Sequence, residues 1–579
     1  MPRSTWSISS TLALSCTIAL AVLLGTPPTN PIEAAPPIAK RLVSPSSWIL
    51  GPMQGRDTNE KTFNDILNHL DQNNIPITVF HFDFDGWETC PNNAQLSLSD
   101  SLLQRMRTHN PPIRGLFWIL PLIKKGCGEF NTGVANGYFV RNHDGSPLVT
   151  SSWQGTGSWI DFKNPQAVAF WHSLLDRIFA RAAGVIGGFY TDDLRPDLGN
   201  DPSYSDTFAR DLLDYTRSKL QDGEVVLKRY GANTPDEAFL ARYGHATFVN
   251  DLEGNFAGLR EGIRRVFATS TLTPAPFNEF TGYSNTAPDA ETYIRRLHWG
   301  AFQPVMENDN LPTSAFPWDA HYPAQVLQAY RYYSNLHWEL IPYFHTYDEI
   351  AYLNNWPIFQ QPNPARYSTV LGREFFVQYV TDYMQSINVN LPAGQWINYW
   401  NEQEMHTGPA TIPVAVPPGR EPVWVANGAI IPMQVRDNST GHGTTASSGA
   451  LTVNVFPHGH SRFSYFDRNQ KWLLLDMTQS GNSVTLCTSA PPSQPVIYRV
   501  GRWTSVPNRV AQLNGAVGIN VGWGTPIPVL GNEQAVDASA GGWYYDTARQ
   551  HLIVKLTRTG SYCPRNATSL LSGTLSTSQ

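Results

Sequence analysis

The sequence predicts an α/β protein in which a (β/α)8 TIM barrel is followed by C-terminal all-β sandwich domains. Two observations lead to this fold class. Between about residues 45 and 350, short apolar runs alternate with stretches whose apolar residues recur at helical spacing, as in a barrel of alternating strands and helices. After about residue 355, β-prone runs alternate instead with Gly, Pro and Asn turns, which is typical of β-sandwiches.

Eight apolar runs are predicted to form the barrel strands, with helical patterns between several of them. The predicted strands are 48–53, 77–82, 113–121, 185–192, 224–230, 246–251, 275–280 and 301–307. The predicted helices are 63–72, 167–181, 208–219, 256–266 and 290–298, and a long pattern over 324–353 is predicted to be the closing helix.

The same patterns divide the chain into five segments. They are a signal peptide over 1–35, the barrel over 36–354, a proximal β-sandwich domain over 355–437, a distal β-sandwich domain over 438–563 and a disordered tail over 564–579. A stretch rich in Ser, Thr and Gly over 438–449 is predicted to link the two β domains, and the tail is rich in Ser and Thr.

The N-terminus and the cysteines both predict export from the cell. The apolar stretch 11–25 has the length of a signal-peptide core and is shorter than the ~20 residues of a membrane span, although a retained membrane anchor is the alternative. Removal of the signal peptide leaves an even number of cysteines, as in many exported proteins. We expect the pairs Cys90–Cys127 and Cys487–Cys563, while the sequence also permits other pairings or free thiols.

The composition limits the class of partner. Charged residues make up only 15% of the 579 residues, against ~25% in a typical soluble protein, and aromatic residues make up 12%. A net charge of −6 without a basic block argues against nucleic acid, and the aromatic content argues against a disordered chain. Carbohydrate is the expected partner, with no membrane contact after signal removal, and the oligomeric state stays open.

Acidic side chains follow several of the predicted strands. In a (β/α)8 barrel the chemistry lies at the C-terminal strand ends. A single acid there is ordinarily a helix cap, but several on one rim also supply the two carboxyl groups, one protonated and one ionised, that cleavage of a glycosidic bond requires. These acids are Asp83 and Asp85 after the second strand, Asp192 and Asp193 after the fourth, Asp251 after the sixth, and Glu307 and Asp309 at the eighth.

A series of short motifs in a fixed order resembles glycoside hydrolase family 31. The stretch 189–196 (F-Y-T-D-D-L-R-P) resembles the nucleophile motif of that family, F-W-x-D-M-N-E-P. The other matching stretches are 79–83 (V-F-H-F-D), 137–147 with 153–155 (W-Q-G) and 161–165 (D-F-K-N-P), 226–229 (V-L-K-R), 242–260 with R-Y and Asp251, 299–304 (W-G-A-F-Q-P), 391–396 (L-P-A-G-Q-W) and 428–432 (G-A-I-I-P). The similarity covers about residues 45 to 560.

The resemblance implies a retaining α-glycosidase that forms a covalent glycosyl-enzyme intermediate and releases a terminal glucose- or xylose-like sugar. Asp192 aligns with the nucleophile and Asp251 with the general acid/base. The substrate-binding residues implied around them are Asp83, Asp85, Trp153, Tyr190, Arg195, Arg229 and Asp309. The alternative to a functional role is a structural one for each residue type: helix cap for Asp, ion-pair partner for Arg and core residue for Trp.

Several positions depart from the family pattern. Arg195 stands where the family has an acid, and Glu307 and Asp309 stand where it has Arg and His. We hypothesise that Arg195 and Asp309 form an ion pair across the sugar subsite. Only about 45 residues precede the first predicted strand, where family members usually carry a β-sandwich.

These departures keep two alternatives open: a carbohydrate-binding pseudoenzyme, and a transglycosylase or lyase variant of the same family. No cofactor is expected, and no metal site is assigned. The pair Asp83 and Asp85 is a weak metal candidate because no third ligand accompanies it in the sequence.

Overall fold

The computed structural model describes residues 46–556, apart from internal gaps. These gaps are 58–59, 84–89, 91–97, 153–154, 192–197, 199–202, 229–241, 250, 274, 282–286, 310–315, 355 and 514. The predicted signal peptide and the predicted tail from 564 lie outside the described residues.

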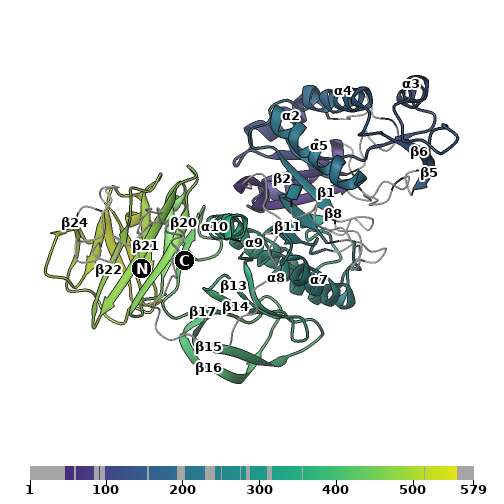
Figure 1. Ribbon diagram of the computed structural model, residues 1–579. Helices are drawn as coiled ribbons and strands as arrows, with labels where there is room; N and C mark the ends of the chain where they lie inside the picture. Colours follow the sequence, from purple (N-terminus) through teal and green to yellow (C-terminus); the bar gives the residue numbers. More distant parts are fainter. Residues whose placement is uncertain are drawn as a thin grey trace, which may run out of the picture. The chain divides into compact units, whose positions relative to one another are not determined.

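The first part of the chain forms an eight-stranded parallel sheet in the order β10-β9-β8-β7-β3-β2-β1-β11 (Figure 1). The backbone N–H of Phe280 donates to the carbonyl of Glu307 at 3.0 Å and so joins the two ends of the sheet. This arrangement confirms the predicted (β/α)8 class. The strands are β1 (Pro52–Asp57), β2 (Val79–Asp83), β3 (Arg114–Trp118), β7 (Ile186–Thr191), β8 (Glu224–Lys228), β9 (Ala246–Phe248), β10 (Pro276–Phe277) and β11 (Met306–Asp309).

Helices alternate with these strands, and all of those given below except α2 fall where the apolar spacing predicts a helix. Polar N-caps fix where several begin: Asn164 accepts from the second residue of α4, Asn255 from the third of α7, and Asp289 from the second and third of α8. The helices are α1 (Glu60–Gln72), α2 (Asp100–Thr108), α4 (Pro165–Arg181), α5 (Tyr204–Lys219), α7 (Phe256–Thr269) and α8 (Ala290–Ala301). No helix in the described part of the chain is both long and apolar enough to cross a membrane.

The predicted closing helix over 324–353 is two helices, α9 (Ala324–Glu339) and α10 (Ile341–Asn354). Pro342 explains the break, because it has no N–H to donate to the carbonyl of Trp338. The side-chain amide of Gln434 donates to that carbonyl instead, at 3.1 Å. The sequence pattern alone did not reveal this break because the apolar spacing continues through it.

His337 on α9 is buried between carbonyl oxygens of Leu50 and Ala301, at 2.8 and 3.2 Å. Burial lowers the pKa of His337 to about 4. The imidazole therefore becomes protonated at a lower pH in the folded protein than in the unfolded chain, where its pKa is about 6.5. The corresponding stability is complete above pH 6.5 and is lost as the pH falls toward 4, by up to ~3 kcal/mol.

Urea unfolding at pH 7 and pH 4.5 checks this expectation. We expect His337→Gln to make the stability less dependent on pH than in the parent protein, whereas His143→Gln, at an exposed position, leaves the dependence unchanged. An equal dependence in His337→Gln and the parent would contradict the assignment.

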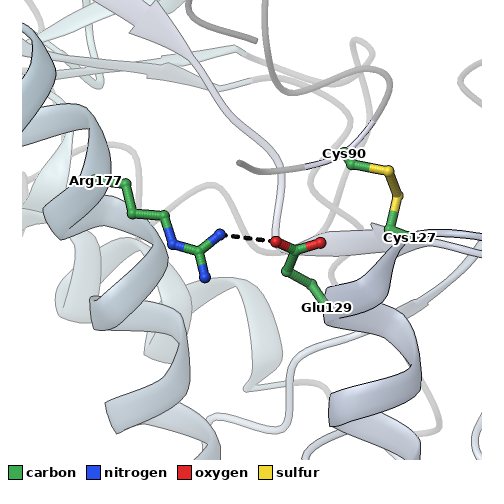
Figure 2. Close-up of a disulfide and its surroundings, with 4 residues drawn as sticks. All are labelled: Cys90, Cys127, Glu129 and Arg177. Carbon is green, nitrogen blue, oxygen red and sulfur yellow. Dashed lines mark hydrogen bonds and ion pairs between the residues drawn. A yellow bond between two sulfur atoms is a disulfide. The ribbon is translucent and has the colours of Figure 1, made fainter. Parts of the chain in front are cut away.

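A small subdomain lies between β3 and α4 that the sequence did not predict as separate elements. It consists of the antiparallel sheet β4-β6-β5 and one helix. The bounds are β4 (Leu122–Lys124), α3 (Gly128–Asn136), β5 (Val149–Ser152) and β6 (Gly155–Trp159). Glu129 of α3 pairs with Arg177 of α4 at 2.7 Å, which ties the subdomain to the barrel (Figure 2).

The predicted disulfide Cys90–Cys127 is confirmed, and Figure 2 shows it next to the start of α3. It links the chain beyond β2 to this subdomain across a sequence separation of 37 residues. Cys487 is also disulfide-bonded, while its predicted partner Cys563 lies outside the described residues.

Removing this cross-link is expected to destabilise the barrel. A disulfide that closes a loop of this length contributes about 3–4 kcal/mol, chiefly by restricting the unfolded chain. We therefore expect the double variant Cys90→Ala/Cys127→Ala to melt several degrees below the parent protein in differential scanning calorimetry. Reductant acts on both disulfides of the parent, so the double variant isolates the effect of this one. An unchanged melting temperature would refute the expectation.

The rest of the chain is predominantly β-structure, as predicted. The first of its sheets has the order β12-β13-β14-β17-β15-β16. Its strands are β12 (Phe359–Asn363), β13 (Ser368–Leu371), β14 (Phe375–Gln378), β15 (Ser386–Asn398), β16 (Asn401–Ala415) and β17 (Val423–Ala426).

Two further sheets follow, with the orders β18-β19-β23-β28-β27 and β20-β21-β22-β25-β24-β26. The strand β18 falls in the range predicted for the proximal domain, yet it pairs with β19 of the next sheet. One short helix, α11 (Glu533–Ala538), accompanies these strands. The strands are β18 (Ile430–Met433), β19 (Leu451–Val455), β20 (His460–Phe466), β21 (Trp472–Ser480), β22 (Ser483–Thr488), β23 (Val496–Val500), β24 (Val510–Leu513), β25 (Ala516–Ile519), β26 (Thr525–Pro526), β27 (Gly542–Asp546) and β28 (His551–Lys555).

Candidate active site

All the predicted site residues except Trp153, which falls between β5 and β6, lie at or after the ends of strands of the parallel sheet, whose C-terminal ends lie at one rim. Asp83 is the last residue of β2, and Asp309 is the last residue of β11. Strand β7 ends one residue before Asp192, and β8 ends one residue before Arg229. Asp251 lies three residues after the end of β9. The topology therefore brings to one rim residues that are up to 226 positions apart in the sequence.

The structure describes the side chains of only some of these residues: those of Tyr190, Asp251 and Asp309. Of Asp83 it describes the backbone alone. Outside the described residues lie Asp85, Trp153, Asp192, Arg195 and Arg229, and with them the hypothesised pair of Arg195 and Asp309.

A buried histidine, which the sequence analysis did not assign to the site, lies below the rim. His81 on β2 is 3% exposed, and its Nδ1 is 3.0 Å from Oε1 of Glu307. Its ring stacks on Tyr190 of β7, with the ring centroids 3.9 Å apart. Tyr190, predicted as an aromatic wall for the sugar, is itself only 4% exposed and holds the imidazole from one side.

Gly55 on β1 provides the space in which these side chains meet. The register places His81, Gly55 and Asp309 side by side on the neighbouring strands β2, β1 and β11. A Cβ atom at Gly55 would lie 3.1 Å from Oε1 of Glu307 and 3.2 Å from Cγ of Asp309. The missing side chain thus lets groups from β2 and β11 approach each other across the strand between them.

A second layer of polar contacts fixes the position of β11 against β1. The side chain of Asn308 donates to the side-chain oxygen of Gln54, and the side-chain amide of Gln54 donates to the backbone carbonyl of Asn308, both at 2.8 Å. Because successive side chains of a strand point to opposite faces, this pairing of Asn308 leaves Glu307 and Asp309 together on the other face.

Glu279, two residues after β10, is another group that the sequence analysis missed. It is 2% exposed, and its buried Oε1 has no hydrogen-bond partner in the part of the chain that the structure describes. Burial raises the pKa of Glu279 well above its usual value, and the negative charges of Asp251, Asp309 and Glu307 raise it further. An acid at the end of a predicted strand was the signal that could have identified it.

Glu307 belongs to the same group of acids. Burial and then the charge of Asp251 raise the pKa of Glu307 to about 8, so that this carboxyl holds a proton at neutral pH. The site thus keeps a protonated acid close to Asp251, which is the kind of environment that general acid–base chemistry on sugars uses.

The comparison with protein families identifies the barrel and the first β sheet. The family model for the glycosyl hydrolases family 31 TIM-barrel domain matches residues 43–347, more than half of the chain. The chain belongs to glycoside hydrolase family 31. The model for the family 31 C-terminal domain matches residues 352–431, so the first β sheet belongs to the family framework as well.

Curated relatives of this family 31 chain include two enzymes of Sporosarcina globispora. The isomaltosyltransferase is 22% identical over 77% of this chain and 44% of its own length. The 1,6-alpha-glucosyltransferase is 24% identical over 90% of this chain and 45% of its own length. The chain therefore spans less than half the length of these relatives.

Solved structures share the fold. The cycloalternan-forming enzyme from Listeria monocytogenes, in complex with a pentasaccharide substrate, has a TM-score of 0.74 at 19% identity and matches 90% of this chain and 54% of its own. A family 31 dextranase from Flavobacterium johnsoniae, complexed with glucose, has the same TM-score at 17% identity, with 90% of this chain and 70% of its own matched.

Proposed function

We propose that this family 31 enzyme is a retaining α-glycosidase that hydrolyses a terminal α-linked, glucose- or xylose-like sugar from an oligo- or polysaccharide. The observation that carries the proposal is the position of Asp251. Its carboxylate follows β9 at the C-terminal rim, acts electrostatically on Glu279 and Glu307, and shares this rim with the strand that leads into Asp192.

The proposed reaction has two displacements. The carboxylate of Asp192 attacks the anomeric carbon, while the carboxyl of Asp251 gives its proton to the leaving glycosidic oxygen, so that a glycosyl-enzyme ester forms. Asp251 then removes a proton from water, which attacks the anomeric carbon and releases Asp192 and a sugar of retained configuration. Asp83, Asp85, Arg229 and the other predicted substrate-binding residues hold the sugar at the rim.

We further propose that the enzyme is exported and acts on carbohydrate outside the cytoplasm. The apolar stretch 11–25 and the disulfide Cys90–Cys127 support this, because disulfides persist in oxidising compartments.

Transglycosylation is the second candidate, because two relatives are named as transferases. In this version a sugar hydroxyl takes the place of water in the second displacement. The substitution of the family's Arg and His by Glu307 and Asp309 favours a third candidate, a pseudoenzyme that binds sugar without turnover.

Product analysis with the full chain tests the three candidates. The enzyme is incubated with aryl α-glucoside, aryl α-xyloside and α-linked gluco-oligosaccharides, and the products are followed by NMR and mass spectrometry. Release of the free α-anomer supports hydrolysis, longer oligosaccharides support transfer, and binding without any turnover would refute the proposal. Release of the β-anomer first would exclude the retaining mechanism.

A further inference from the structure

We propose that His81, Glu307 and Asp309 bind one divalent transition-metal ion, such as Mn²⁺ or Zn²⁺, below the catalytic rim. One ligand atom from each of the three side chains lies within 4.8 Å of the others. Three donors so spaced can surround one ion at the ~2.0–2.4 Å typical of nitrogen and oxygen ligands. Hydrolysis by Asp192 and Asp251 requires no ion, so the inference goes beyond the proposed function.

All three ligands lie on strands of the parallel sheet, and none lies on a loop. His81 and Asp309 come from β2 and β11, which flank β1, and Gly55 lies between them in the register. Glu307 reaches the same point from two residues before Asp309. A site built on strands is preorganised, because its ligands need little ordering when the ion enters.

A hydrogen bond alone accounts for only part of this cluster. It explains the 3.0 Å separation between His81 and Glu307. It does not explain why Glu279 lies close enough to Asp309 and Glu307 for their charges to act on it, nor why its buried Oε1 has no hydrogen-bond partner among the described residues. Crowded acids repel one another when they ionise, and a bound cation would relieve this repulsion in place of protons.

The ligand types decide which ions fit. An imidazole with two carboxylates is a mixed nitrogen and oxygen set, which suits Mn²⁺, Zn²⁺ and their neighbours, whereas Ca²⁺ and Mg²⁺ prefer oxygen alone. Three protein ligands leave coordination positions open for water or for sugar hydroxyls, as catalytic metal sites do. The ion would also place a positive charge at the positions where the family has Arg and His.

Titration of the full chain with the metal alone tests the proposal, after removal of bound metal with a chelator. Isothermal titration calorimetry with Mn²⁺ and Zn²⁺, and the Mn²⁺ electron paramagnetic resonance spectrum, should each report one ion per chain. We expect His81→Gln and Asp309→Asn to weaken the affinity about 10–100-fold. Gly55→Ala is expected to weaken it as well, because its methyl group would occupy the space beside Glu307 and Asp309.

The matched control is His172→Gln. His172 also pairs with a carboxylate, Asp211, at 3.0 Å, but it belongs to α4 and lies outside the cluster. This variant should bind Mn²⁺ as the parent does. Circular dichroism and thermal melting verify that each variant is folded, and Asp309→Asn is the mildest change. Absence of binding at millimolar metal would overturn the proposal, and so would full retention of binding in folded Asp309→Asn and Gly55→Ala.

Discussion

Replacing Asp251 by alanine is expected to lower kcat/KM for α-linked oligosaccharides by about 10²–10⁴-fold, the usual contribution of a general acid/base. The reason is that a sugar alkoxide leaves poorly without a proton. An aryl glycoside with an acidic phenol as leaving group needs little protonation, so the first displacement of Asp251→Ala should be nearly normal on such a substrate. Added azide, which needs no general base, should restore its turnover and yield the glycosyl azide of retained configuration.

Steady-state kinetics on both substrate types, with and without azide, measure this effect. Glu253→Ala is the matched control because Glu253 is an exposed acid two residues away in the same loop. The activity of this variant should stay within about twofold of the parent activity. Equal losses on oligosaccharide and aryl glycoside, or no loss in Asp251→Ala, would contradict the acid/base role. The same azide test on Asp192→Ala should give the inverted product if Asp192 is the nucleophile.

Replacing Arg295 by methionine is expected to lower the free energy of unfolding by about 3–5 kcal/mol. Arg295 on α8 is fully buried and contacts Glu421 at 3.2 Å, while it also donates to the carbonyl of Val416 at 2.6 Å. Glu421 accepts a further hydrogen bond from Tyr333 at 2.5 Å. Burial raises the pKa of Glu421, and the charge of Arg295 opposes that rise, so removal of the arginine leaves a buried acid without its cation.

Chemical denaturation of the single and double variants separates the energetic contribution of the Arg295–Glu421 ion pair from that of its surroundings. The double variant Arg295→Met/Glu421→Leu should recover part of the loss, because no unpaired charge remains. Glu261→Gln is the control: this acid pairs with Arg264 and Arg265 at the protein surface, and its loss should cost less than ~1 kcal/mol. A loss in Arg295→Met no larger than in the control would refute the structural role.

The (β/α)8 class was predictable because each strand is a short apolar run and each helix has its own periodicity, and both are local properties of the sequence. The break between α9 and α10 escaped the sequence analysis because the apolar spacing continues through it, although Pro342 marks it locally. Only the tertiary structure shows that Gln434, almost 100 residues away, replaces the missing donor of Pro342. The subdomain around α3 escaped because its strands are only 3, 4 and 5 residues long, too short for a clear pattern.

The sequence by itself determined the order of barrel and β domains, the resemblance to family 31 and the positions of Asp192 and Asp251 after their strands. These are properties of local pattern and motif order. Only the tertiary structure brought His81 of β2 to Glu307, 226 positions later, and placed Glu279 in the same buried group of acids. These contacts depend on the register of the strands and on the absence of a side chain at Gly55. Local sequence patterns do not predict the register between strands that are far apart in the chain.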